Sequence, residues 1–419
     1  MLKRKLPMAD GIDSSSPRVS PGFIALVSHD WNDQWLGRAQ VMSRIAKQFH
    51  VVWCGPPHEW RAIPKRARSG PSVQHPVDDL PMLHTYRPEP WLPRLYRPRT
   101  LALRLMQRRL ENARAILERQ GCTHIVLSIW SPQYSKALPL VKHDLSMYHI
   151  NDEYSFARVQ QPISAEERVL MAEVDEVFIH SPAVMARKAA LCSSATLTPN
   201  GVDFNAFAAS RPIPDDLAAI PSPRIGYSGF LKTQLDWELL YETAQQNPQW
   251  SFVFVGKALE QPGLPETLAR LGALRNVHFL GGKSSRELAA YPQHFDVCML
   301  PYCVDDYTKY IDPLKLSEYM ASGRPAIGTP ILPLRDVSDL VALAETPAEW
   351  RQAISASLLP VANAAEERAK RQSWAKARTW DALVDTILMK VEQHLGSVPL
   401  NVPAAVLRPG AEQASNALL

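Results

Sequence analysis

The residues with the clearest chemical potential lie in the segment Asp312-Pro-Leu-Lys-Leu-Ser-Glu-Tyr-Met-Ala-Ser-Gly323. Asp312 can cap a helix by accepting hydrogen bonds from its first free N–H groups, and Pro313 suits the first helical position. Gly323 suits the left-handed residue that ends many helices, so the segment predicts one short helix. Lys315 then lies in the first turn, where its ammonium group and the positive end of the helix dipole both favour an anion such as a diphosphate.

Glu318 follows Lys315 by three residues and shares its face of the predicted helix. Its carboxylate can accept hydrogen bonds from the two hydroxyls of a ribose while the phosphates lie at the helix start. The alternative interpretation is an ordinary ion pair on an amphipathic helix. The context favours a site, because apolar runs at 296–301 and 325–329 predict strands on either side of the helix. The helix then starts at the carboxyl edge of a sheet, where open α/β sheets bind ligands.

Two more predicted turns combine glycine with a nearby lysine. Gly229 follows one apolar run, and Lys232 comes three residues later. Gly256 follows the next apolar run, and Lys283 comes after a pair of glycines further on. Either lysine can reach the phosphates of a bound ligand, although lysines in loops are more often solvated.

Short apolar runs alternate with stretches of helical period along most of the chain, which is typical of parallel α/β architecture. In the first half the predicted strands are residues 23–28, 51–54, 124–129, 145–150, 176–180 and 196–198, with helices at 38–49 and 104–119. In the second half they are residues 224–227, 251–255, 276–280, 296–301, 325–329 and 340–344, with helices at 237–246, 285–291 and 313–322. We therefore expect two Rossmann-like domains whose ligand-binding edges face each other across a cleft.

The chain resembles the GT-B glycosyltransferases, a class with two facing Rossmann domains. The run PLKLSEYMASGRPAIGT is similar to the donor motif of their C-terminal domain. RIGYSGFL, FVFVGK, NVHFLGGKSSRELAAY and FDVCMLPY resemble, in order, earlier units of that domain, and TPNGVDFNAF resembles the interdomain signature. The resemblance covers roughly residues 23–394 and implies a nucleotide-sugar donor. The donor-binding residues that we expect are Lys315, Glu318, Gly229, Lys232, Gly256, Lys283, Tyr302, Pro313 and Leu314.

The resemblance also implies a division of the chain. Proline-rich residues 207–223 are expected to form an extended linker, because proline removes backbone donors. We predict a disordered leader over 1–21, an N-terminal acceptor-binding domain over 22–206, a C-terminal nucleotide-sugar-binding domain over 224–372, a crossover helix over 373–395 and a disordered tail over 396–419.

Two departures from the class bear on mechanism. Many retaining members carry a glutamate eight residues before the ribose-binding one, and here that position is Tyr310. No Asp-x-Asp motif occurs, so the metal-binding device of the other major transferase fold is absent. We therefore expect inversion of the anomeric configuration, no cofactor and no metal, with Lys315, helix N-termini and backbone amides neutralising the diphosphate.

Inversion needs a general base on the acceptor side of the cleft. Asp152 directly follows one predicted strand, and Asp30, with His29 beside it, follows the first. These segments resemble the xanthan-type glucuronosyltransferases, whose Tyr-x-x-x-Asp-x-x-Ser is matched here by Tyr148, Asp152 and Ser155, and the resemblance implies Asp152 as the base. The alternatives are local roles: Asp152 as a turn or cap residue, and His29 and Asp30 as residues that order their loop.

The acceptor that the resemblance implies is a lipid-linked saccharide or a polysaccharide of bacterial exopolysaccharide or cell-surface glycan synthesis. Arg38, at the start of its predicted helix, can face an anionic acceptor, and Trp31 in the preceding loop is a second candidate for acceptor binding. Other functions on the same fold are a retaining transferase, a nucleotide-sugar epimerase and a catalytically silent binding subunit. A dinucleotide-dependent oxidoreductase is excluded, since neither domain opens with Gly-x-Gly-x-x-Gly.

Basic and aromatic residues gather between positions 61 and 119, where thirteen Lys or Arg stand against five Asp or Glu, a local balance of +8. Trp91 and Tyr96 lie in this stretch, with Trp60 just before it, and the mixture suits an anionic membrane surface. A solvated basic helix face is the alternative. We do not expect nucleic acid as a partner, because no recognised nucleic-acid module accompanies the patch.

Five scattered cysteines without a Cys-x-x-Cys pair indicate a reducing compartment. No apolar run is long enough to span a bilayer, and no apolar region follows the basic residues near Met1 as in a secretory signal. We therefore expect a cytoplasmic protein that binds peripherally to the inner face of the cytoplasmic membrane.

Overall fold

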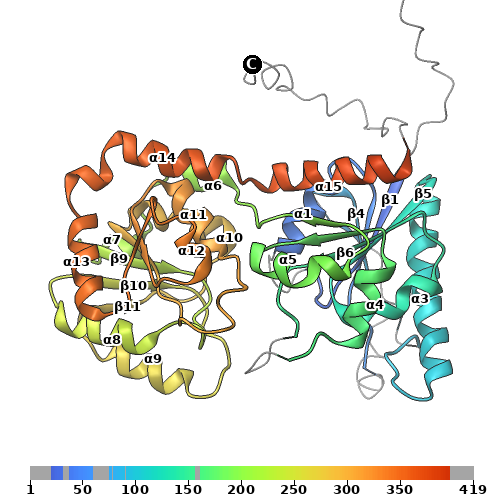
Figure 1. Cartoon of the computed structure of the whole chain (residues 1–419), viewed down its shortest axis with the longest axis horizontal. Helices are drawn as coiled ribbons and strands as arrows, with labels where there is room; N and C mark the ends of the chain where they lie inside the picture. Colours follow the sequence, from blue (N-terminus) through green and yellow to red (C-terminus); the bar gives the residue numbers. More distant parts are fainter. Residues whose placement is uncertain are drawn as a thin grey trace, which may run out of the picture.

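A computed structural model describes residues 20–31, 37–59, 75–77, 79–89, 91–155 and 161–396. It contains two sheets that lie side by side, each flanked by helices, with the two last helices running along both domains (Figure 1). Residues 1–19 and 397–419, which make up most of the predicted leader and tail, lie outside the described residues.

The N-terminal sheet has the strand order β3-β4-β2-β1-β5-β6-β7-β8, and all neighbours are parallel except β3 and β4. Its strands are β1 (Pro21–Leu26), β2 (Val51–Cys54), β3 (His75–Val77), β4 (Leu80–Tyr86), β5 (His124–Ile129), β6 (Leu145–Ile150), β7 (Glu176–Ile179) and β8 (Ala195–Leu197). The six strands expected in this half are confirmed. They could be predicted because strands buried on both faces have continuous apolar sequences. The apolar pattern predicts neither β3 nor β4, and β4 is buried only in part.

The helices of the N-terminal domain are α1 (Gly37–Ile45), α3 (Arg99–Arg119), α4 (Ala165–Glu173) and α5 (Pro182–Lys188), with the 3-10 turns η3 (Pro132–Leu140) and η4 (Ala189–Leu191). α1 packs on one face of the sheet with the last helix, α15 (Trp380–Leu395), and their shared core includes Met42, Ile45 and Ile387. α3, η3 and α4 pack on the opposite face. Because β1, β5, β6, β7 and β8 are parallel, their carboxyl ends lie at one edge of this sheet.

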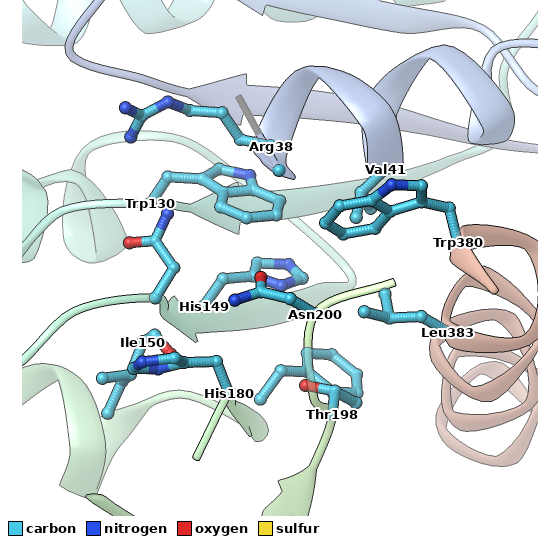
Figure 2. A pocket seen from close by; sticks show the side chains of 13 residues that line it. Arg38, Val41, Trp130, His149, Ile150, His180, Thr198, Asn200, Trp380 and Leu383 are labelled. Carbon is cyan, nitrogen blue, oxygen red and sulfur yellow. The ribbon is translucent and has the colours of Figure 1, made fainter. Parts of the chain in front are cut away.

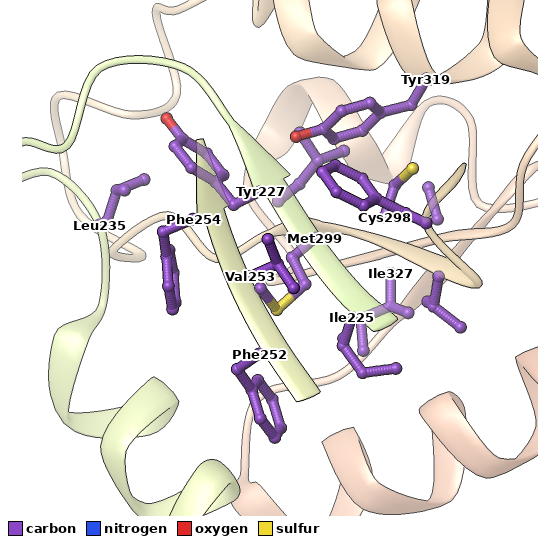
Figure 3. Close-up of a cluster of buried hydrophobic side chains, with 14 of the residues drawn as sticks. Ile225, Tyr227, Leu235, Phe252, Val253, Phe254, Cys298, Met299, Tyr319 and Ile327 are labelled. Carbon is purple, nitrogen blue, oxygen red and sulfur yellow. The ribbon is translucent and has the colours of Figure 1, made fainter. Parts of the chain in front are cut away.

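The C-terminal sheet is parallel throughout, with the order β11-β10-β9-β12-β13-β14. Its strands are β9 (Arg224–Ser228), β10 (Ser251–Val255), β11 (Val277–Phe279), β12 (Val297–Leu300), β13 (Ala326–Gly328) and β14 (Val341–Leu343), as the apolar runs predict. The helices are α8 (Trp237–Gln246), α9 (Leu264–Gly272), α10 (Ser285–Leu288), α11 (Leu314–Ser322), α12 (Leu332–Arg335) and α13 (Pro347–Ser357), with 3-10 turns η5 (Pro292–His294) and η6 (Pro360–Asn363). Figure 3 shows Phe252 and Phe254 of β10 packed into this core beside Ile225 of β9.

The proline-rich stretch 207–223 differs from the extended linker that we expected. It begins inside α6 (Phe204–Ala208) and contains α7 (Asp215–Ala218). Leu217 is fully buried, and Ile220 is nearly so, both in the core of the C-terminal domain. The prolines set turns between these short helices, so the stretch packs onto the domain that follows it.

The crossover helix predicted over 373–395 is in fact parts of two helices. α14 (Ala365–Lys376) packs against α11 of the C-terminal domain, and α15 packs against α1 of the N-terminal domain. Between them Thr379 caps α15 by accepting a hydrogen bond from the backbone of Ala382, at 3.1 Å. The break between the two helices lies where Thr379 pairs with Val202 of the interdomain connection. The two segments that link the domains therefore lie side by side. The predicted return of the C-terminal helix to the first domain is confirmed (Figure 1).

Candidate active site

Helix α11 forms where the Asp312–Gly323 segment predicts it, but it begins differently. Pro313 is the residue that precedes the helix, with extended backbone angles, and no side chain caps it. Asp312 therefore does not cap α11, which corrects our expectation. Its carboxylate instead accepts a hydrogen bond from the backbone N–H of Asn200 in the interdomain connection, at 2.6 Å. Gly323 ends the helix in the left-handed conformation, as expected.

Lys315 and Glu318 lie together in the first turns of α11, with 3.3 Å between Nζ and Oε2. Both side chains are largely buried, although the pair lies at the edge of the sheet. Burial raises the pKa of the Glu318 carboxyl, and the charge of Lys315 opposes that rise. The arrangement combines a cation, a helix start and a hydrogen-bond acceptor in one place, which are the features expected for a nucleotide diphosphate.

The glycine turn after β9 touches Lys315 directly. Gly229 has a φ of +148°, and a Cβ added there would lie 2.3 Å from Cε of Lys315. Gly256, after β10, has a φ of +156°, and a Cβ there would lie 1.9 Å from the carbonyl oxygen of Gly229. Only glycine fits either position, because both the backbone angles and the space exclude a side chain. The two glycine turns are thus stacked against the start of α11.

Lys232 and Tyr302 complete this cluster. The Lys232 Nζ lies 5.7 Å from the centre of the Tyr302 ring, which is buried beneath it. Burial lowers the pKa of Lys232, the charge of Lys315 lowers it further, and Asp152 opposes both effects. We name Gly229, Gly256, Lys232, Tyr302, Lys315 and Glu318 the α11 cluster. Leu314 points from this region into the N-terminal core, and Pro313 is buried beside it.

Lys283 does not join the α11 cluster. Its Nζ lies 2.7 Å from Oδ2 of Asp216, on α7, and 5.8 Å from the centre of the Tyr291 ring. The hydrogen bond to Asp216 raises the pKa of Lys283. Since the expected linker folds into α7, it supplies the carboxylate that pairs with this lysine.

Asp152 lies at the end of β6 and faces the C-terminal domain. Its Oδ1 accepts hydrogen bonds from the backbone N–H of Glu153, at 2.8 Å, and from the hydroxyl of Tyr307, at 3.1 Å. Tyr307 belongs to the loop between β12 and α11, so this contact crosses from one domain to the other. Burial raises the pKa of the Tyr307 phenol, which keeps its hydroxyl protonated as the donor.

A buried ion-pair network holds the loop that carries Asp152. Glu153 accepts a charge-assisted hydrogen bond from Lys188 of α5, at 2.8 Å, and Lys188 also bonds Glu167 of α4, at 2.7 Å. The hydroxyl of Ser155 donates to Glu153 at 2.6 Å. Burial alone would raise the pKa of Glu153, but the hydrogen bonds from Lys188 and Ser155 outweigh it and the net pKa is lowered. The residues beside Asp152 are therefore anchored in the domain core.

His29 and Asp30 follow β1 and make contacts that order their loop. Asp30 pairs with Arg87 after β4, with 3.2 Å between Oδ2 and Nη2. The carbonyl of His29 accepts a hydrogen bond from the indole N–H of Trp53, at 3.1 Å. Trp31 packs edge to face on the same Trp53 ring, with 5.0 Å between ring centres.

Arg38 lies on the wall of a small hollow at the carboxyl edge of the N-terminal sheet (Figure 2). Burial lowers the pKa of Arg38, and Tyr154 and Tyr134 oppose that effect. The hollow is bounded by residues from α1, the ends of β5 to β8 and α15, including Arg38, Trp130, His149, Asn151, His180, Asn200 and Trp380.

The described residues contain no group of three or more His, Cys, Asp or Glu side chains that could hold a metal ion. Nor does any helix within the described ranges reach the length and apolarity of a membrane span.

Comparison with solved structures identifies the architecture. An Escherichia coli structure described as trehalose-6-phosphate bound with UDP-2-fluoro glucose is similar over 89% of this chain and 99% of that one, with a TM-score of 0.63 and 10% identity. A glycosyltransferase from Rickettsia africae ESF-5 is similar over 90% of this chain and 99% of that one, with a TM-score of 0.60 and 10% identity. The protein has the GT-B fold.

Sequence comparison adds a family match in the C-terminal domain and one curated relative. Residues 223–359 match the family described as Glycosyl transferases group 1. The chain is 32% identical over 132 residues to the putative teichuronic acid biosynthesis glycosyltransferase TuaH of Bacillus subtilis (strain 168). The alignment takes in 31% of this chain and 33% of that protein, so the chain spans about a third of the length of this curated relative. The family match includes β9 to β14 and the whole α11 cluster.

Two parts of the GT-B cleft were not anticipated from the sequence. Tyr307 lies in a polar loop after β12, and that position is the only feature of the sequence that marks it as a site residue. Its hydroxyl meets Asp152 because of the conformation of this loop. His149 reads as an ordinary strand residue, but its ring lies between Trp130 and Phe178, with centre distances of 3.9 and 5.0 Å. Neither contact follows from residue spacing.

Proposed function

We propose that this GT-B protein is a glycosyltransferase that moves a sugar from a nucleotide-sugar donor to an acceptor with inversion of configuration. The observation that carries the proposal is the position of the α11 cluster, which faces Asp152 across the domain junction through the loop of Tyr307. This geometry supports the proposal, because group transfer requires the donor and the base to meet at one place.

In this proposal the α11 cluster binds the donor. The diphosphate lies at the start of α11, where Lys315, Lys232 and backbone N–H groups neutralise its charge in place of a metal ion. Glu318 accepts hydrogen bonds from the ribose hydroxyls. The donor is UDP- or GDP-linked; UDP is supported by the E. coli GT-B neighbour that was solved with UDP-2-fluoro glucose.

Asp152 acts as the general base. Its carboxylate takes the proton of the acceptor hydroxyl as that oxygen bonds to the anomeric carbon of the sugar. The bond between that carbon and the diphosphate oxygen breaks at the same time, and its electron pair leaves with the nucleotide diphosphate. The acceptor hydroxyl takes over the hydrogen bond to Oδ1 that Tyr307 makes in the structure.

The acceptor in this proposal is a lipid-linked saccharide or polysaccharide at the inner face of the cytoplasmic membrane. Trp91 and Tyr96 are 67% and 70% exposed, and Leu101 at the start of α3 is exposed beside them. The same stretch of chain carries four exposed arginines, which are Arg97, Arg99, Arg104 and Arg108. Apolar side chains rimmed by cations suit the interface of an anionic bilayer.

A panel of nucleotide sugars tests the donor assignment by thermal stabilisation, because a ligand that binds the native state raises its melting temperature, and more so the tighter it binds. One nucleotide sugar should stabilise the wild-type protein, and Lys315→Gln should lose most of that shift. The product of the reaction should carry the inverted anomeric configuration by NMR. Retained configuration would favour a retaining transferase, and binding without any turnover would favour a silent subunit.

A further inference from the structure

The hollow beside α15 is lined by a buried imidazole, one of whose two nitrogens has no hydrogen-bond partner among the described residues. His149 is 4% exposed, and its Nε2 has no hydrogen-bond partner among the described residues. Trp130 covers one face of the ring, nearly parallel to it, and Phe178 stacks on it as well. Since both faces of the ring are covered, only its edge, where the nitrogens are, is left to make a hydrogen bond. An unsatisfied buried polar atom costs about 1–3 kcal/mol, which a ligand or water in the hollow would recover.

Arg38 supplies a positive charge on the wall of the same hollow. No carboxylate of the described residues pairs with it, and the groups that act on its charge are the phenols of Tyr154 and Tyr134. Arg38 also lies in the first turn of α1, a helix of nine residues with no acidic side chain in that turn. The free N–H groups at the start of a helix attract anions in the same way as the guanidinium does.

His149 does not add to this charge. Burial lowers the pKa of His149 to about 3, so its ring is neutral at physiological pH. The hollow thus offers one cation and neutral hydrogen-bonding groups, with the apolar side chains of Trp380 and Leu383 on the far wall (Figure 2). Asn151, immediately before Asp152, also lines it, so an occupant would lie next to the candidate base.

We propose that this hollow binds an anionic group of the acceptor, a phosphate or a carboxylate on its saccharide, with Arg38 holding the charge and His149 donating or accepting one hydrogen bond. The inference rests on the proposed function, because it assigns the chemical class of the acceptor used by that site. It makes Arg38 a determinant of acceptor specificity: a neutral acceptor would leave its charge uncompensated.

Binding of inorganic phosphate and of glucuronate, measured by calorimetry on the full chain, tests the proposal. The measurements use a Lys315→Gln background, so that the α11 cluster contributes little to the binding of either anion. Arg38→Gln in that background should weaken binding at least about tenfold, the usual loss for one charge-assisted hydrogen bond. Arg44→Gln is the matched control: it removes the same charge from α1, where Arg44 pairs with Asp381, and should leave affinity unchanged.

Two more variants keep the test decisive. Arg38→Lys retains the charge without the planar guanidinium group, so it should bind the anion more tightly than Arg38→Gln. It also reports on the role of this residue if Arg38→Gln fails to fold. His149→Phe fills the stack without a nitrogen and should also weaken binding. Whichever anion binds more tightly identifies the group, phosphate or carboxylate. Equal affinity of the Arg38→Gln and Arg44→Gln proteins would overturn the inference, whereas failure of every nucleotide sugar to bind the wild-type protein would overturn the proposed function instead.

Discussion

The hydroxyl of Tyr307 donates to Oδ1 of Asp152 across the two domains, at 3.1 Å, although the residues are 155 positions apart. Asp152 stands at the end of β6, and Tyr307 lies in the loop that leads into α11. The same junction is held by Ser181, whose hydroxyl donates to the carbonyl of Tyr310 at 2.8 Å, and by the contact of Asp312 with Asn200. The loop before α11 therefore couples the donor side of the cleft to the candidate base.

Removal of that hydroxyl should loosen the junction without abolishing chemistry. We expect Tyr307→Phe to cost about 1 kcal/mol of unfolding free energy, the usual net value of one hydrogen bond, and to lower kcat less than about tenfold. Denaturant unfolding and turnover measure the two effects. Tyr241→Phe is the control, since that hydroxyl lies outside the domain junction and accepts a hydrogen bond from Gln245 of its own helix. A Tyr307→Phe protein as inactive as one without Asp152 would show that the phenol takes part in catalysis.

Gly229 should be indispensable for donor binding. Gly229→Ala adds a methyl group at a φ of +148° and 2.3 Å from Cε of Lys315, so the lysine must move away from the start of α11. We expect nucleotide-sugar affinity to fall at least about tenfold, the effect of losing one charge-assisted hydrogen bond. Gly263→Ala is matched in having a left-handed φ, of +77°, but nothing within 4 Å, and should affect only stability. Titration calorimetry compares them; equal donor affinities would contradict this assignment.

Asp312 should make stability depend on pH between about 4 and 6. Burial raises the pKa of Asp312 to about 6, above the ordinary value of about 3.9. The folded state therefore binds more protons in that window, and the free energy of unfolding falls as pH rises through it. We expect Asp312→Asn, which can still accept from Asn200, to remove this slope and to stabilise the protein at pH 7 by on the order of 2 kcal/mol.

Urea unfolding at pH 4, 5, 6 and 7 measures that slope. The wild-type protein and the Asp312→Asn variant should have similar stability near pH 4 and should diverge as pH rises. Parallel curves for the two proteins across this range would mean that Asp312 is not responsible.

The basic surface around α3 should bind anionic vesicles. Each cation near a charged bilayer contributes about 1 kcal/mol, so Arg99→Gln combined with Arg104→Gln should weaken binding on the order of 30-fold. Sedimentation with vesicles containing phosphatidylserine measures this, and salt should release the wild-type protein. Arg275→Gln with Arg286→Gln makes the same charge change on the exposed surface of the C-terminal domain. If both pairs of substitutions weakened vesicle binding equally, binding would depend on the net charge of the protein and not on the surface around α3.

Much of the fold was predictable because most strands of both sheets are buried and parallel, so strands such as β5, β6 and β10 appear as uninterrupted apolar runs. The α11 cluster was predictable for a related reason: glycine turns and a helix start recur at fixed places along such a sheet. What failed depends on packing between distant segments. Asp312 accepts a hydrogen bond from Asn200, in the chain that connects the domains. Lys283 pairs with Asp216 of α7, a helix that the proline-rich sequence does not predict.

The Tyr307 contact and the His149 stack show the same limit. Each depends on where a loop or a ring lies relative to another strand, and residue spacing carries no information about that. The pattern therefore predicted where α11 lies along the chain, whereas the hydrogen-bond partners of Asp312 and Asp152 are visible only in the structure.

The most direct test of the account is the kcat of Asp152→Asn for transfer of labelled sugar to the lipid fraction of bacterial membranes, at saturating nucleotide sugar. Loss of a general base should reduce kcat by about 100-fold or more while the dissociation constant of the donor stays unchanged, since Asp152 lies outside the α11 cluster. A kcat within a few-fold of the wild-type value, at equal donor affinity, would contradict the assignment of Asp152 as the base.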